Sequence, residues 1–127
     1  MQSTQHNLEA RETRTLIGSD KVEGTAVYRP NGDRIGAIER VMIDKLSGQT
    51  AYAVMSFGGF LGFGGDYYPL PWSLLKYDEG LDGYVVDITD EQLQGAPRHA
   101  SADESAWKDP EWDRKVNEYY HVPPYML

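Results

Sequence analysis

The segment FGGFLGFGGDYYPLPW at residues 57–72 constrains the fold more than any other part of the sequence. Two Gly-Gly pairs in this segment enclose a short apolar loop, which we call the knuckle. Because glycine adopts positive φ without steric cost, the pairs predict a sharp reversal of the chain at each end of the knuckle. The knuckle consists of Phe60, Leu61, Gly62 and Phe63, and the turn residues around it are Gly58, Gly59, Gly64 and Gly65.

Two interpretations of the knuckle stay open. An exposed apolar tip of this kind would bind a protein partner. The same loop could instead fold over one end of a barrel and plug it. A tip that inserts into lipid is disfavoured, because no basic residues flank the knuckle to meet anionic headgroups.

Strand-like sequence flanks the knuckle at residues 50–57 and 66–70. Pro69 and Pro71 lack an amide donor, so we expect them to stop the hydrogen-bond ladder of the second of these strands. Residues 72–75 then predict a single helical turn that starts after Pro71. Four more strands are expected at residues 22–28, 35–45, 75–79 and 84–88.

The turn between the first two strands contains Asn31 and Gly32, a pair typical of hairpins in which glycine takes positive φ. In the strand expected at residues 35–45, the alternation of apolar and polar side chains shifts by one position near Glu39. One additional residue there would place the apolar side chains of that strand on one face, which is typical of a β-bulge. The side chains concerned are Ile38, Val41 and Ile43.

The strand at residues 50–57 is apolar on both faces. Tyr52 and Val54 occupy one face, while Ala51, Ala53, Met55 and Phe57 occupy the other. The interior of a barrel covers only one face of a strand, and a strand that is apolar on both sides is usually covered on both. We therefore expect the face with Tyr52 and Val54 to be covered by the C-terminal segment or by a second copy of the chain.

Two helices are expected after the last strand. Thr89 or Asp90 begins a short one as its N-cap, and residues 95–97 end it. A second helix begins at Asp109, with Pro110 in its first position. Its apolar stripe, together with a tryptophan just before it, predicts a helix that docks on the domain. These aromatic residues are Trp107, Trp112, Tyr119 and Tyr120.

Composition limits the function further. The chain has 127 residues, which suits one domain, and a formal charge of −8. Its basic residues are scattered, so nucleic acid is an unlikely partner on charge alone. The absence of cysteine excludes disulfides and thiolate chemistry. No apolar run approaches the roughly 20 residues that span a bilayer, and the N-terminus has no signal-peptide pattern, so we expect a cytoplasmic protein.

The segment at residues 57–72, together with GDRIG at residues 32–36, resembles the PRC-barrel family. The resemblance covers residues 16–97 and is closest to small stand-alone bacterial members. It implies a mainly β fold: a small closed or partly open antiparallel β-barrel of about six strands, a short helix after the last strand and a C-terminal helical extension. Residues 1–15 are then a disordered or frayed arm, and residues 98–127 a linker with a docking helix and tail.

No catalytic, cofactor-binding or metal-binding residue is predicted. The serines of the barrel region have no histidine nearby in sequence to activate them. His6, His99 and His121 lie outside the barrel region and lack metal-ligand spacing. Three carboxylates in one turn, Asp78, Glu79 and Asp82, could hold a cation, but solvated turn carboxylates explain them better.

The sequence therefore predicts a non-enzymatic protein-interaction module that self-associates, with a homodimer favoured, and binds another protein. The PRC-barrel fold also occurs in the photosynthetic reaction centre H subunit and in a 16S ribosomal RNA maturation factor. Alternatives are thus a ribosome- or RNA-associated factor, an accessory to photosynthetic electron transfer, or a small-molecule binder with a cleft beside the C-terminal helix. The predicted interaction residues are Phe60, Leu61, Phe63, Tyr52, Val54, Trp107, Trp112, Tyr119 and Tyr120.

Overall fold

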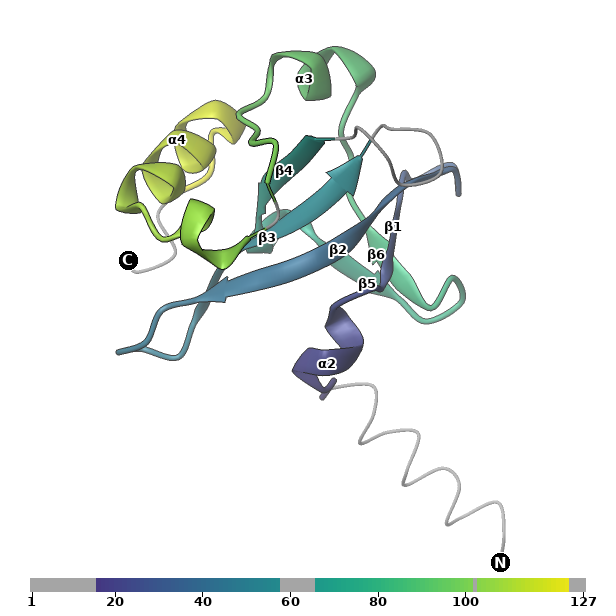
Figure 1. Ribbon diagram of the computed structural model, residues 1–127. Helices are drawn as coiled ribbons and strands as arrows, with labels where there is room; N and C mark the ends of the chain where they lie inside the picture. The colour runs from purple at the N-terminus through teal and green to yellow at the C-terminus, as the bar shows by residue number, and fades with distance from the viewer. Residues whose placement is uncertain (1–15, 58–65, 102, 124–127) are drawn as a thin grey trace, which may run out of the picture.

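The computed structural model describes residues 16–57, 66–101 and 103–123 (Figure 1). Its centre is a six-stranded sheet with the strand order β4-β3-β2-β1-β6-β5. The strands are β1 (Ala26–Tyr28), β2 (Arg34–Ile43), β3 (Thr50–Phe57), β4 (Asp66–Pro71), β5 (Lys76–Asp78) and β6 (Gly83–Val85). The helices are α2 (Ser19–Val22), the 3-10 turn η1 (Trp72–Leu74), α3 (Asp90–Gly95), the 3-10 turn η2 (Glu104–Trp107) and α4 (Pro110–Tyr120).

The mainly β class and the six strands predicted from the sequence are confirmed. The knuckle, its turn residues Gly58, Gly59, Gly64 and Gly65, and the N-terminal arm lie outside the described residues. The sheet is not closed into a barrel, but it curves strongly. Residues 71 and 76 belong to opposite edges of the sheet, and a chain of that length spans at most about 18 Å. Six strands in a flat sheet would set those edges about 24 Å apart, so the sheet has to bend.

One strand pair differs from the antiparallel arrangement that was expected. β1 pairs with β6 in parallel, with Val27 opposite Tyr84, while the other four pairs of neighbours are antiparallel. The reason lies in η1, which carries the chain from one edge of the sheet to the other without a hairpin. β5 therefore keeps the direction of β4, and the hairpin to β6 returns the chain in the direction of β1.

A β-bulge in β2 is confirmed at the predicted place. The register of β2 against β3 shifts between Ile38 and Arg40, and a second shift follows between Met42 and Ile43. Ile38 is buried and Val41 packs against the same core. Ile43 is 50% exposed, so the prediction that it shares this inner face is wrong. Ile43 is the last residue of β2, where the strand leaves the sheet for the β2–β3 turn.

The two prolines of β4 do not stop its ladder, which corrects another prediction. Pro69 lies opposite Val54 and Pro71 lies opposite Tyr52. β4 is the edge strand, and Tyr67, two residues before Pro69, bonds through both its N–H and its carbonyl to His99, away from β3. Residues 69 and 71 lie two and four positions after Tyr67, so their backbone nitrogens face the same side of the strand as that of Tyr67, away from β3. The prolines therefore remove no bond between β3 and β4.

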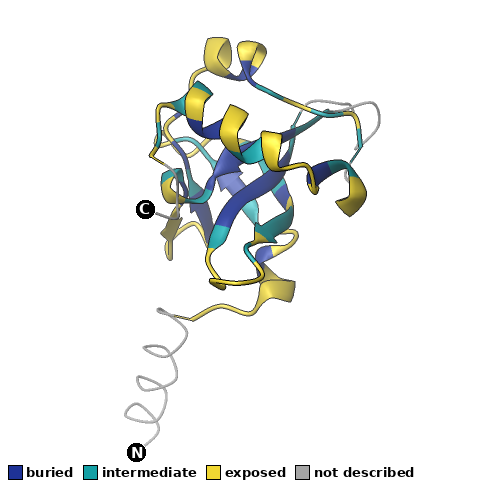
Figure 2. Ribbon diagram, turned by 90° about the vertical axis from the view of Figure 1, so that its left-hand side faces the viewer, coloured by how far each residue is buried: buried dark blue, intermediate teal, exposed yellow. Residues whose placement is uncertain are grey.

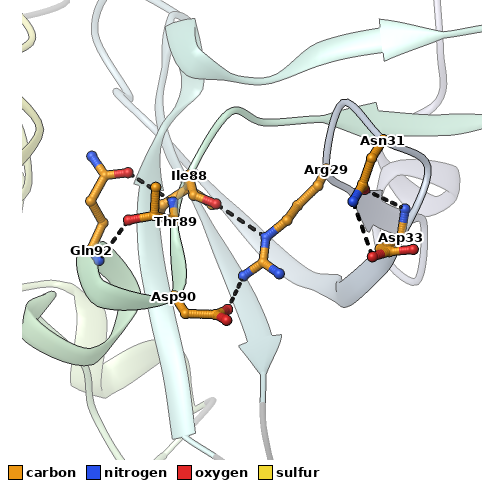
Figure 3. Close-up of polar contacts among 7 residues, drawn as sticks. All are labelled: Arg29, Asn31, Asp33, Ile88, Thr89, Asp90 and Gln92. Carbon is orange, nitrogen blue, oxygen red and sulfur yellow. Dashed lines mark hydrogen bonds and ion pairs between the residues drawn. The ribbon is translucent and has the colours of Figure 1, made fainter.

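The start of the domain is helical where a strand was expected. Residues 19–22 form α2, and Gly24 takes a φ of 89° before β1 begins at Ala26. The hairpin turn after β1 is confirmed: Gly32 has a φ of 94°, and the Asn31 side chain accepts a hydrogen bond from the Asp33 backbone N–H (Figure 3). β5 and β6 have three residues each, two fewer than predicted for either.

Two separate cores stabilise the fold. The main core lies within the curve of the sheet and includes Ala53 and Met55 of β3 together with Leu93 of α3. The second core, on the other side of β3, is built around Tyr52, Val54 and Trp107 and also contains Ala51. Figure 2 shows the buried strands beneath α4, whose outward side is exposed. Both faces of β3 are therefore buried inside a single chain.

Helix α3 is fixed to the β1–β2 turn, as Figure 3 shows. The Arg29 side chain donates from Nε to the carbonyl of Ile88 at 3.1 Å and pairs with the Asp90 carboxylate. Thr89 is the N-cap, as one of the two predicted alternatives had it. Its hydroxyl accepts from the Gln92 N–H at 3.1 Å, and the Gln92 side chain accepts from the Thr89 N–H at 2.8 Å.

Replacing Thr89 with alanine removes the hydroxyl half of this capping box. We expect the free energy of unfolding to fall by about 1 kcal/mol, because the Gln92 N–H loses its only helix-end acceptor. Denaturant unfolding measures the change. Thr89→Ser keeps the hydroxyl and is the matched control; a loss of equal size in both variants would contradict the role of the cap.

Candidate interaction surface

Residues after Pro97 pack against the sheet from its β4 edge. The backbone of His99 forms an antiparallel bridge with Tyr67, with N···O distances of 2.9 and 3.0 Å. Arg98 donates to the Tyr68 hydroxyl at 2.8 Å and lies over the Tyr68 ring. These contacts cover part of the exposed edge of β4, so the stretch predicted to be a polar linker is instead attached to the sheet.

Trp107 is the centre of this attachment. It is 1% exposed, and its ring lies 4.7 Å from that of Trp112 and 6.4 Å from that of Tyr52, between ring centroids. Its indole N–H donates to the carbonyl of Ser101 at 3.1 Å, and the Tyr52 hydroxyl donates to the carbonyl of Trp107 at 2.8 Å. The second face of β3 is thus covered by the C-terminal segment, one of the two alternatives that the sequence left open.

Helix α4 begins at the residues predicted from the sequence, with Asp109 as its N-cap. The Asp109 carboxylate accepts from the Glu111 N–H at 2.9 Å, and Pro110 occupies the first helical position. His121 ends the helix in the left-handed region with a φ of 56°. Val116 is fully buried beneath the helix, which fixes its inner side against the sheet.

A groove lies where this segment meets the β2–β3 hairpin. It has a volume of about 620 Å³. Its apolar lining comes from Met42 and Ile43 of β2, Ala51 and Tyr52 of β3, Trp107 and Pro110. Its charged lining is Asp44, Lys45, Glu104, Lys108, Asp109 and Asp113. The groove therefore has apolar and charged walls that come from parts of the chain about sixty residues apart.

The carboxylates of the groove have identifiable partners and neighbours. Asp44 accepts from the N–H groups of Leu46 at 2.9 Å and of Ser47 at 2.8 Å, which closes the hairpin turn. The pKa of Asp113 is raised above its usual value, chiefly by burial, while a hydrogen bond from Asn117 lowers it and the charge of Asp44 raises it further. Asp44 and Asp113 thus repel each other across the groove.

Comparison with known families decides what kind of domain this is. The family model described as PRC-barrel domain matches residues 14–93, which is more than half of the 127 residues. The chain belongs to the PRC-barrel family. No curated protein matches the chain. The PRC-barrel match ends within α3, so Trp107 and α4 lie outside the matched residues.

The aromatic residues predicted to form an interaction surface lie mainly inside this PRC-barrel protein. Tyr52, Val54 and Trp107 are buried in the second core, and Trp112 packs against them half-buried. Tyr119 and Tyr120, also half-buried, pack against the main core, and the Tyr119 hydroxyl donates to the carbonyl of Gln92. These six side chains pack within the chain; that they form a surface for a partner stays a prediction. Phe60, Leu61 and Phe63 lie outside the described residues.

Exposed apolar side chains occur instead at the β2–β3 hairpin. Leu46 is 99% exposed at its turn, and Ile43 lies beside the groove. Sequence reasoning assigned Ile43 to the inner face of its strand and did not select Leu46, because a single leucine in a turn carries no signal by itself. The signal for Ile43 is its position in the groove beside the C-terminal segment, which depends on the folded chain.

The turn carboxylates between β5 and β6 serve the hairpin itself. Asp78 accepts from the Leu81 N–H at 3.1 Å, and Asp82, with a φ of 54°, accepts from the Tyr77 hydroxyl at 2.5 Å. This bond is the main reason why the pKa of Tyr77 is raised to about 12. Among the residues that the structure describes, no group of three or more histidines or carboxylates is placed to hold a metal ion. Across the same residues, every helix is too short or too polar to cross a membrane.

Proposed function

We propose that this PRC-barrel protein is a non-enzymatic interaction module that binds another protein through the β2–β3 hairpin and the adjoining groove. The PRC-barrel domain is a fold of the protein-interaction type, which is the general basis for the proposal. The observation that carries it is the exposure of Ile43 and Leu46 beside a groove with an apolar lining. Apolar side chains exposed beside a concave surface favour a binding role.

The chemistry of the groove supports binding rather than catalysis. Its carboxylates accept hydrogen bonds from backbone amides at a turn and at a helix end, as Asp44 and Asp109 do. Such bonds hold the hairpin turn and the start of α4 in place, which is a structural role for these carboxylates. Serine and histidine do not line the groove within the described part of the chain.

The predicted homodimer stays a prediction. Its basis was the second face of β3, and Trp107 of the same chain lies against that face. A separate protein is therefore our preferred occupant of the groove surface. A role on ribosomes or RNA is less well supported, because the formal charge of −8 opposes contact with phosphates.

Capture of partners from native cell extract tests this proposal when it is done with surface variants. The double variant Ile43→Ser, Leu46→Ser removes the exposed apolar groups next to the groove. We expect the unmodified protein to retain a partner that this variant loses, with most of the bound amount gone. The variant Leu81→Ser changes an exposed leucine on the β5–β6 hairpin and is the matched control.

Two outcomes would contradict the proposal. In the first, both variants retain the same proteins as the unmodified chain, so the hairpin plays no part in binding. In the second, the retained material is ribosomal and is released by salt, which would favour the RNA-associated alternative. Thermal unfolding of all three proteins checks that the substitutions leave the fold intact, as exposed positions predict.

A further inference from the structure

The groove has the size and the lining of a site for a few side chains of a partner. Its volume of about 620 Å³ lies within the usual range for binding pockets, roughly 300–1,000 Å³. Met42 and Tyr52 line its apolar part, and Ile43 at 50% exposure leaves apolar area for a partner to cover. An extended segment laid along the groove would bury this area.

The charges on the groove are unequal. Four carboxylates line it, against the two ammonium groups of Lys45 and Lys108. Lys108 lies 3.9 Å from Glu104, but both side chains are more than half exposed, so this pair is largely screened by solvent. Two of the carboxylates come from different parts of the chain: Asp44 lies on the hairpin and Asp113 on α4. Both line the groove, the charge of Asp44 acts on Asp113, and Asp113 is partly buried.

We infer that this groove binds a basic segment of a protein partner, with a lysine or arginine side chain between Asp44 and Asp113 and a neighbouring apolar side chain on Ile43. The inference rests on the proposed function and names the chemistry of its partner. A cation at this position relieves the repulsion between the two carboxylates and gains charge-assisted hydrogen bonds. The formal charge of −8 also attracts a basic segment over a longer range and speeds its encounter.

The test uses the full chain and three labelled probe peptides. One peptide alternates lysine with leucine and serine, the second has glutamate in place of lysine, and the third has glutamine there. Fluorescence anisotropy at low salt measures binding of each. We expect the lysine peptide to bind best, the glutamate peptide not to bind, and added salt to weaken the binding of the lysine peptide.

Variants locate the site. In Asp44→Asn, Asp113→Asn the side chains keep their oxygen acceptors for the turn but lose both charges. We expect the affinity for the lysine peptide to fall roughly tenfold or more. The control Asp87→Asn, Glu91→Gln removes the same charge from exposed positions outside the groove and should change the affinity little. Ile43→Lys places a cation at the groove by a substitution at an exposed position, and it should weaken binding to a similar degree even if the Asn variant proves unstable.

Three results would overturn the inference: equal binding of the three peptides, equal losses in the groove and control variants, or no binding of the lysine peptide to the unmodified chain. None of them would decide the proposed function, because loss of the captured partner in Ile43→Ser, Leu46→Ser is a separate measurement. If that loss occurs while the lysine peptide fails to bind, the hairpin still binds a protein and only the basic chemistry is wrong.

Discussion

Replacing Trp107 with alanine is expected to lower the free energy of unfolding by about 3–5 kcal/mol. The indole is 1% exposed and packs against Tyr52, Trp112 and His99, so its removal leaves a large cavity in the second core. The carbonyl of Ser101 also loses its indole donor. Chemical unfolding, followed by a probe other than tryptophan fluorescence, measures the change.

The matched control for Trp107 is Leu46→Ala, which shortens an exposed side chain and should change stability by less than about 0.5 kcal/mol. The same Trp107 variant should bind more of a hydrophobic dye, because the apolar face of β3 with Tyr52 and Val54 loses its cover. A Trp107→Ala protein as stable as the unmodified one would contradict the attachment of the C-terminal segment to β3.

Replacing Gly36 with alanine is expected to destabilise the fold by about 3 kcal/mol or to prevent folding. A Cβ atom at this position would lie 2.0 Å from the carbonyl oxygen of Ser56 and 3.0 Å from Cγ of Met55. The first of these is a backbone atom of β3, so relief requires the β2–β3 pair to move apart. That movement would disturb the strand pair on which both cores are built.

A glycine whose Cβ position meets an exposed side chain and no backbone atom provides the control for Gly36. At Gly80 the nearest atom to a Cβ is a side-chain oxygen of Asp78, at 3.2 Å, and the residue is exposed. Gly80→Ala should therefore change the free energy of unfolding by less than about 1 kcal/mol. Comparable losses in the two variants would show that close approach of β2 and β3 is not the reason for glycine at residue 36.

The local features of this fold could be read from the sequence because each depends on nearby residues. The strand at residues 50–57, the bulge near Ile38 and the capped starts of α3 and α4 were all predicted from spacing or capping residues. The parallel pairing of β1 with β6 was not, because it depends on how far η1 carries the chain around the curved sheet. Local alternation contains no information on that path.

The prolines of β4 illustrate the same limit. Whether Pro69 and Pro71 break a ladder depends on which side of the strand their missing amides face and on whether that side has a neighbour. Both properties follow from the pairing of the strand and not from its sequence. A proline in an expected edge strand is therefore compatible with a full ladder on its inner side.

The packing of these aromatic residues inside the chain was not apparent from the sequence for a related reason. Aromatic residues are typical both of interfaces between proteins and of contacts within a chain, and composition does not distinguish the two. The Tyr52 hydroxyl donates to the backbone carbonyl of Trp107, and the Trp107 indole donates to the carbonyl of Ser101, so both polar groups have partners within the chain. The attachment of residues 98–101 uses the backbone of His99 with that of Tyr67, and a polar sequence gives little sign of such contacts. The groove arises only where these distant parts meet.

Trp107 covers the second face of β3 in its own chain, and the second core depends on this contact. Nuclear Overhauser effects between the Trp107 indole and the Tyr52 ring test it most directly, measured in a uniformly labelled sample and in an isotope-filtered mixture of labelled and unlabelled chains. We predict that the contact appears in the uniform sample and is absent from the filtered spectrum. A contact seen between labelled and unlabelled chains, or none in either sample, would contradict the claim.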